Sequence, residues 1–268
     1  MKITTDLKPR WDDFAVYLPA MQKPFARGVY KKSATARPMP DGITLADINF
    51  LNPKSKLWHY KYALYSAGQF KTGERAVDAV TERDSSVTIL GDSGGFQIGK
   101  GKLPGFDKLP RNLTVEKIGN LWTNAIATKL HIVNWLETHA DYAMTIDMPL
   151  WAKLPQNKMS PFHKCSIEQL VELTVDNLRF IRANQRGRTK WLNVIQGTNA
   201  DDMRMWWNAV KRYRFSGWAL AGNVGWRGDG YSFCRRYCPT EWLDRPHRRG
   251  YSNLVRVSCP DICSLPGP

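Results

Sequence analysis

The sequence has 268 residues, of which 43% are hydrophobic and 24% charged. This length suits one large soluble domain, or two small ones, with a real apolar core, and an α/β barrel of ordinary size also fits. The formal net charge is +15. Because Lys and Arg that neutralise phosphates release condensed counterions, this charge favours nucleic acid as a partner over a role in solubility alone.

Three further features narrow the class of protein. The N-terminal segment MKITTDLKPRWDDF lacks the apolar run of a signal peptide. No stretch approaches the roughly 20 apolar residues of a transmembrane helix, so we expect no membrane association. The five cysteines are odd in number and badly distributed for a disulfide framework, and we expect a reducing cytoplasm.

Short apolar runs alternate with longer segments of helical spacing along most of the chain. The expected strands are residues 14–18, 87–90, 142–146, 191–195 and 218–221, and a loop rich in Pro, Lys and Arg follows the first. The expected helices are residues 113–140, as one helix or two with Thr114 as the cap, then 166–183 and 200–213. This order predicts an α/β fold with parallel strands and helical crossovers.

The alternation ends near Trp226. From Trp226 to Pro268 there are seven Arg, no Lys and four of the five cysteines. We therefore divide the chain into an α/β domain, residues 1–225, and an atypical C-terminal segment, residues 226–268. This segment is either irregular and in contact with nucleic acid, or the product of a frameshift, since one permissible back-translation from Asp229, read one nucleotide later, encodes a helix pattern.

Polar residues or glycine follow four of the expected strands, namely Asp92, Asp147, Gln196 and Gly222. The carboxyl ends of strands in a parallel α/β barrel open onto one face, where active sites are built. A carboxylate can accept hydrogen bonds from the N1–H and N2–H₂ edge of guanine, and a Gln amide or a backbone N–H can donate to its O6 atom. The set therefore predicts a pocket for a guanine-like base.

The residues after Asp92 support this hypothesis. Gly94 and Gly95 allow the backbone to approach a flat ligand, and Phe96 can stack on it. The alternative for Asp92 is a purely structural role as the cap of the next helix.

Four motifs in order resemble the tRNA-guanine transglycosylase family. They are DSGGFQ (residues 92–97), TIDMP (145–149), VIQG (194–197) and GWALAGNVG (217–225), and the similarity spans residues 14–225. The resemblance implies a TIM barrel that exchanges guanine for a 7-deazaguanine such as queuine, preQ1 or preQ0, by way of a covalent aspartyl-sugar intermediate. It implies that Asp92 is the proton acceptor and a base contact, and that the base site is formed by Ser93, Gly94, Gly95, Phe96, Asp147, Gln196, Gly197 and Gly222. No cofactor is implied.

Two parts of the family pattern are missing. The segment that carries the nucleophilic aspartate is not recognisable, and Asp261 in PDICSLP is the nearest candidate. The Cys-x-Cys-x-x-Cys…His zinc motif of the bacterial tRNA-acting members is also absent, so we predict no metal site.

These departures favour DNA over tRNA as the substrate. Phage and bacterial relatives of the DpdA group insert 7-deazaguanines into DNA and lack much of the tRNA-specific C-terminal part. The compact, basic chain is more similar to that group, which implies a bacterial or phage-infected cell. The tRNA-acting relatives often form dimers, so an oligomer is possible.

The sequence leaves two other interpretations open. The string GDSGG also occurs in trypsin-like proteases, with Ser93 as nucleophile, but the only earlier histidine is His59, in an unrelated context. The second alternative is a basic, catalytically defective nucleic-acid-binding protein. The missing nucleophile favours it, while the base-pocket residues favour an enzyme.

Overall fold

The computed structural model describes residues 16–31, 39–102, 113–221 and 254–256. Within these ranges the chain forms a single seven-stranded sheet in which every paired strand is parallel to its neighbour. The strands are β1 (Ala20–Met21), β2 (Tyr62–Ser66), β3 (Thr88–Asp92), β4 (Tyr142–Met144), β5 (Lys190–Ile195), β6 (Gly217–Leu220) and β7 (Leu254–Arg256). The helices are α1 (Lys23–Lys31), α2 (Leu45–Ile48), α3 (Gly95–Gly99), α4 (Val115–Thr123), α5 (Ile126–His139), α6 (Ile167–Asn184) and α7 (Ala200–Val210). These elements confirm the predicted α/β class.

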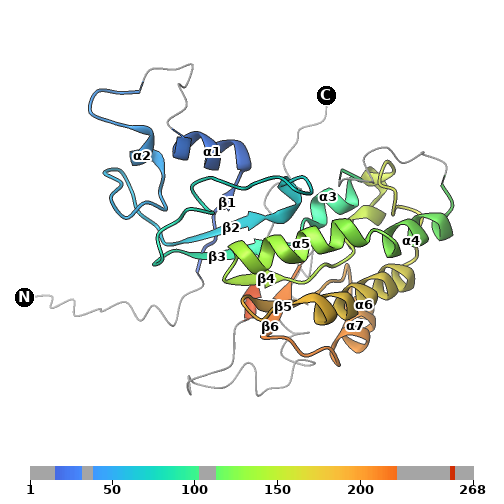
Figure 1. The fold of residues 1–268 in the computed structure, drawn as a ribbon. Helices are drawn as coiled ribbons and strands as arrows, with labels where there is room; N and C mark the ends of the chain where they lie inside the picture. The colour runs from blue at the N-terminus through green and yellow to red at the C-terminus, as the bar shows by residue number, and fades with distance from the viewer. Residues whose placement is uncertain (1–15, 32–38, 103–112, 222–253, 257–268) are drawn as a thin grey trace, which may run out of the picture.

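The strands lie side by side in their order along the chain, from β1 to β7. A doubly wound sheet reverses its strand order at a switch point, and the described sheet has no such reversal. Helices α5, α6 and α7 pack in series on the sheet, with α5 against β3 and α7 against β5 (Figure 1). Among the described residues β1 and β7 are the two outer strands, so the sheet as described is parallel and singly wound, without a closing pair.

The two faces of the sheet carry separate apolar clusters. Strand residues such as Tyr65, Ile89 and Trp191 belong to the large cluster that includes the helices. Leu90, Met144, Leu192, Val194 and Ala219 form a second cluster to which no described helix contributes. Because side chains alternate along a strand, this second cluster is the opposite face of β3, β4, β5 and β6. Each of its five members is at most 5% exposed, so this face is also sealed from water.

The long helices begin and end close to the predicted positions. The Thr114 hydroxyl caps α4 by accepting a hydrogen bond from the backbone N–H of Lys117. The helix is interrupted at Asn124 and Ala125, so the segment 113–140 forms two helices and not one. At the start of α6, Ser166 and Gln169 form a reciprocal capping box.

The N-terminal third differs most from the sequence prediction. The prediction of a strand at 14–18 is wrong for the described residues of that range. Val16, Tyr17 and Leu18 are not in a strand, and β1 follows Pro19. The loop predicted next contains α1, which begins with Lys23 and tolerates Pro24 in its first turn. Strand β2 and the three-residue β7 were not predicted, and β4 is shorter than the expected strand.

Among the described residues, no helix is both long and apolar enough to cross a membrane.

Candidate functional site

Three of the predicted site residues lie at one edge of the sheet. Asp92 is the last residue of β3, Gln196 directly follows β5, and Asp147 lies three residues beyond β4. Because the strands are parallel, their carboxyl ends meet at this edge. A fourth polar residue, Ser66, ends β2 and is paired in register with Asp92.

Ser66 and Asp92 lie on the face of the sheet that carries the second cluster. Leu64 and Leu90, two residues earlier on the same strands, belong to that cluster or pack against it. Since the side-chain period of a strand is two, Ser66 and Asp92 continue this face beyond its apolar part. The sequence had placed Asp92 at a strand end, but Ser66 could be found only by recognising β2 and its register.

Asp92 is held by its immediate surroundings. The backbone N–H of Gly94 donates to the Asp92 carboxylate at 3.2 Å, and the Ser66 hydroxyl also bonds to this carboxylate. Burial raises the pKa of Asp92 above its ordinary value, and these hydrogen bonds oppose that rise. Asp92 is therefore a carboxyl group that takes up protons more readily than one in water.

Asp147 and Gln196 form a buried pair. The Gln196 amide donates to the Asp147 carboxylate and also to the Met148 carbonyl oxygen, at 3.0 Å for the latter. The amide oxygen of Gln196 accepts from the Leu150 backbone N–H at 2.9 Å. Every part of the amide is thus used within the protein, and Gln196 positions Asp147. To donate to a bound base, Gln196 would have to exchange one of these hydrogen bonds.

The environment of Asp147 shifts its protonation strongly. Burial, followed by repulsion from the nearby Asp92 carboxylate, raises the pKa of Asp147 to about 7. Two carboxyl groups that share a buried site do not both ionise easily, and such pairs supply an acid and a base at the same pH. Near neutral pH, Asp147 can therefore either accept hydrogen bonds from a ligand or donate one to it.

The glycines of the DSGGFQ motif have two different roles. Gly94 has a φ of +94°, and an added Cβ there would lie 2.9 Å from the Cα of Gly68, so the two backbones touch. An added Cβ on Gly95 would lie 3.9 Å from an Asp147 carboxylate oxygen, which places the start of α3 beside that carboxylate. In the VIQG motif, Gly197 has a packing role, because a Cβ there would collide with Met203.

Ser93 is fully buried. Its hydroxyl donates to the Thr145 carbonyl oxygen at 3.2 Å, which joins the end of β3 to the chain after β4. Within the described residues this hydroxyl is thus committed to a structural hydrogen bond, an arrangement that favours neither a base contact nor a protease nucleophile.

Phe96 lies at the surface beside this group, with 47% of its area exposed. Its ring stacks on Trp151 with centroids 5.7 Å apart, and the Lys100 ammonium lies 5.8 Å from one ring centroid and 5.5 Å from the other. The backbone of Gly99 makes room for the indole, since a Cβ at Gly99 would lie 2.4 Å from Trp151. Lys100 and Trp151 were missed in the sequence, because the turn of α3 brings Lys100 to Phe96 and the loop after β4 brings Trp151.

Two predicted site residues, Gly222 and Asp261, lie outside the described residues, as do the C-terminal cysteines. Within the described ranges, no group of three or more His, Cys, Asp or Glu side chains is gathered closely enough to hold a metal ion.

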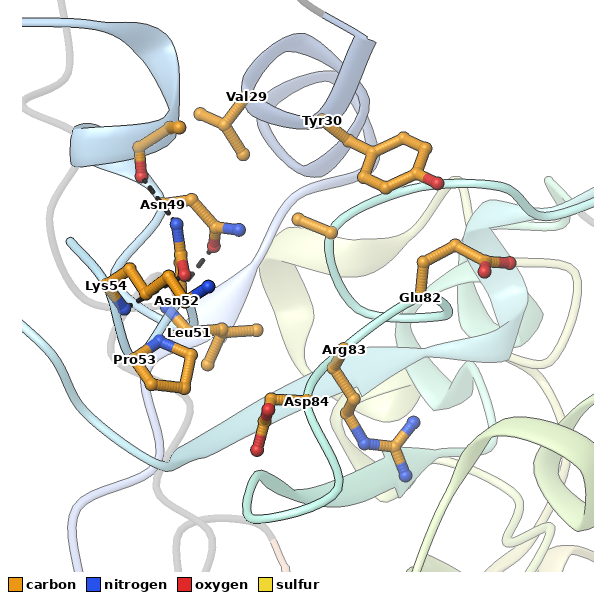
Figure 2. Close-up of a pocket in the computed structure, with 12 residues that line it drawn as sticks. Val29, Tyr30, Asn49, Leu51, Asn52, Pro53, Lys54, Glu82, Arg83 and Asp84 are labelled. Atoms are coloured by element: carbon orange, nitrogen blue, oxygen red, sulfur yellow. Dashed lines mark hydrogen bonds between the residues drawn. The ribbon is translucent and has the colours of Figure 1, made fainter.

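A cavity of about 460 Å³ lies away from this site, before the start of β3 (Figure 2). Its walls come from α1, the chain after α2, and residues 82–84. The guanidinium of Arg83 is used by backbone carbonyls and by Asp141, and Asn49 and Asn52 bond within their own loop. We assign no chemistry to this cavity, because the paired carboxyls lie at the other edge of the sheet.

Comparison with known proteins adds no further assignment. The sequence matches no protein-family model, and no curated protein matches it.

Proposed function

We propose that this chain is a base-exchange transglycosylase of the tRNA-guanine transglycosylase type, which replaces a guanine in nucleic acid by a free 7-deazaguanine such as preQ0. The observation that carries the proposal is a pair of carboxyls, Asp147 buried and Asp92 partly buried, at the carboxyl edge of a parallel sheet beside an exposed aromatic ring. The proposal extends to the fold, which we infer to be a TIM-type barrel.

Two features of the sheet support a barrel. The strands follow one another in chain order without reversal, as the wall of a barrel requires. The face opposite the helices is buried although no described helix covers it, which is what the interior of a closed sheet provides. In a barrel, Ser66 and Asp92 stand at the rim of that interior.

The roles of the site residues follow from their chemistry. The ionised form of Asp147 accepts hydrogen bonds from the N–H edge of the base, and Gln196 fixes the direction of the carboxylate. Phe96 offers a face on which the base stacks. The base must leave its stack in the nucleic acid to enter such a site.

The exchange takes place in two balanced steps. A carboxylate oxygen attacks C1′ of the sugar, the C1′–N9 bond breaks, and the departing guanine keeps the electron pair and takes up the proton carried by the Asp92 carboxyl. The incoming base then gives its N9 proton to Asp92, and its N9 attacks C1′ and releases the carboxylate. Asp261 is our candidate for the attacking carboxylate, from the sequence alone, and DNA is our preferred substrate over tRNA.

The test is incorporation of radiolabelled guanine or preQ0 into duplex DNA and, separately, into unmodified tRNA. We expect label in DNA, a loss of at least about 100-fold with Asp92→Ala, and no effect of Glu172→Gln on the exposed side of α6. Asp261→Asn is assayed next, and full activity of that variant would remove Asp261 as the nucleophile.

The other outcomes are equally decisive. Label in tRNA alone would reverse the substrate preference. The absence of label from both, with folded protein, would contradict the proposal and favour the alternative of a nucleic-acid-binding protein without exchange activity.

A further inference from the structure

We propose that the segment 49–62 forms a second surface, separate from the carboxyl pair, that binds single-stranded nucleic acid by stacking bases on Trp58. We call this surface the aromatic ladder and define it by Phe50, Trp58, Tyr60 and Tyr62. It does not depend on the proposed exchange reaction.

The four rings of the aromatic ladder are in contact one after another. The centroid distances are 5.0 Å from Phe50 to Trp58, 5.5 Å from Trp58 to Tyr60, and 5.6 Å from Tyr60 to Tyr62. Trp58 and Tyr60 are nearly parallel, with 10° between their planes. The sheet anchors one end of the ladder, since Tyr62 is the first residue of β2.

Trp58 is the most exposed of the four rings, and the other three are partly buried. Trp58 is 53% exposed, and the neighbouring Leu57 and Tyr17 are 59% and 71% exposed. Tyr17 is tied to the ladder by the Tyr60 hydroxyl, which donates to its carbonyl oxygen at 2.6 Å. Large aromatic side chains usually bury their area, so a supported indole left in water is typical of a binding surface.

The charge around the ladder identifies the kind of partner. From Ile48 to Gly73 the sequence contains four lysines and no Asp or Glu. Lys54, Lys56 and Lys61 are exposed in the same segment, and the Lys61 ammonium lies 5.3 Å from the Tyr62 centroid. The Asp47 carboxylate, just before this run, accepts a hydrogen bond from the backbone N–H of Lys56. The lysines outnumber it, and aromatic faces among an excess of lysines complement a nucleic-acid strand that offers bases and phosphates.

The ladder and the candidate site lie at opposite edges of the sheet. Tyr62 begins β2, whereas Ser66 ends it beside Asp92. In Figure 1 the chain after α2 lies where β2 and β3 start, and α3 lies beyond their arrowheads. A nucleotide stacked on the ladder is therefore a different nucleotide from one whose base occupies the carboxyl pair.

The experiment measures binding of a fluorescein-labelled oligothymidylate of about 20 nucleotides to the full chain by anisotropy, against a duplex of the same length. We expect Trp58→Ala to weaken single-strand binding roughly 5- to 150-fold, the range for the loss of one stacked base, with Trp58→Phe recovering most of it. Trp58 is exposed, so we expect both variants to fold.

Charge is tested by a matched pair of double variants. Lys56→Gln with Lys61→Gln should lower the slope of log affinity against log salt by about 1.4, the value for two single-strand phosphate contacts. Lys117→Gln with Lys211→Gln removes the same charge from α4 and from the end of α7, both exposed, and should leave the slope nearly unchanged.

Three results would overturn the inference. Equal affinity of Trp58→Ala and the unchanged protein would exclude stacking, and equal effects of the two lysine pairs would mean that only overall charge is felt. A dimer that Trp58→Ala converts to monomer in sedimentation would assign the ladder to a second copy of the chain. Asp92→Asn should leave oligonucleotide binding unchanged, which separates this test from that of base exchange.

Discussion

Asp147 links the chemistry of the site to the stability of the fold. Its pKa of about 7 lies above the 3.8 of an ordinary aspartic acid, because burial and Asp92 both oppose its negative charge. The folded protein thus holds this proton more tightly than the unfolded chain does. The stabilisation from this group is complete below about pH 4 and is lost as the pH rises towards 7.

We therefore expect Asp147→Asn to stabilise the fold at about pH 8, by up to about 4 kcal/mol, and to have little effect near pH 3.5. Asparagine keeps an oxygen that accepts from Gln196 but carries no charge. Denaturant unfolding at the two pH values measures this difference. An equal effect at the two pH values would show that the ionised form of Asp147 does not destabilise the fold.

Ser66 is expected to tune the pKa of Asp92. Its hydroxyl bonds to the ionised carboxylate and opposes the rise caused by burial, so Ser66→Ala should raise the pKa of Asp92 further. The ¹³C carboxyl shift of Asp92, followed by NMR during a pH titration, reports this change without any need for activity. Ser66→Thr, which keeps a hydroxyl, is the control, and an unmoved titration in Ser66→Ala would contradict the assignment.

At the scale of elements, the helices were more predictable than the strands. The apolar spacing and caps of α6 are local in sequence, so Ser166 and Leu170 are enough to place its start. The strand β2 has aromatic and small residues in place of an aliphatic run, and only its pairing between β1 and β3 makes it a strand. Helix α1 was hidden by its Pro and basic residues, although Ala26 and Val29 are buried.

The site shows the same division between local and non-local information. The strand ends at Asp92 and Gln196 could be predicted because a polar residue follows an apolar run. The bond of Gln196 to Asp147 and the contact of Trp151 with Phe96 depend on how neighbouring loops fold back, which spacing does not encode.

The whole molecule depends on two apolar layers, one on each face of the sheet. Leu192 is fully buried in the layer without described helices. If the sheet curls around this layer, hydrogen bonds between the strands keep them in place. The strands then cannot move inward to fill a cavity left by a smaller side chain. We then expect Leu192→Ala to cost about 3–5 kcal/mol, near the upper end for such truncations.

Urea unfolding measures this cost, with Leu121→Ala, half-exposed on α4, as the control of small effect. A loss below about 1 kcal/mol for Leu192→Ala would mean that this face of the sheet is open enough to relax or to admit water.

The backbone contact between Gly68 and Gly94 has a consequence for how such sequences can vary. A Cβ on Gly68 would lie 2.8 Å from the Cα of Gly94, and a Cβ on Gly94 would lie 2.9 Å from the Cα of Gly68. Either change would push apart the two turns that carry Ser66 and Asp92 to the same edge. The two positions should therefore vary together. In a related sequence where one of them is not glycine, we expect both turns to have a different spacing.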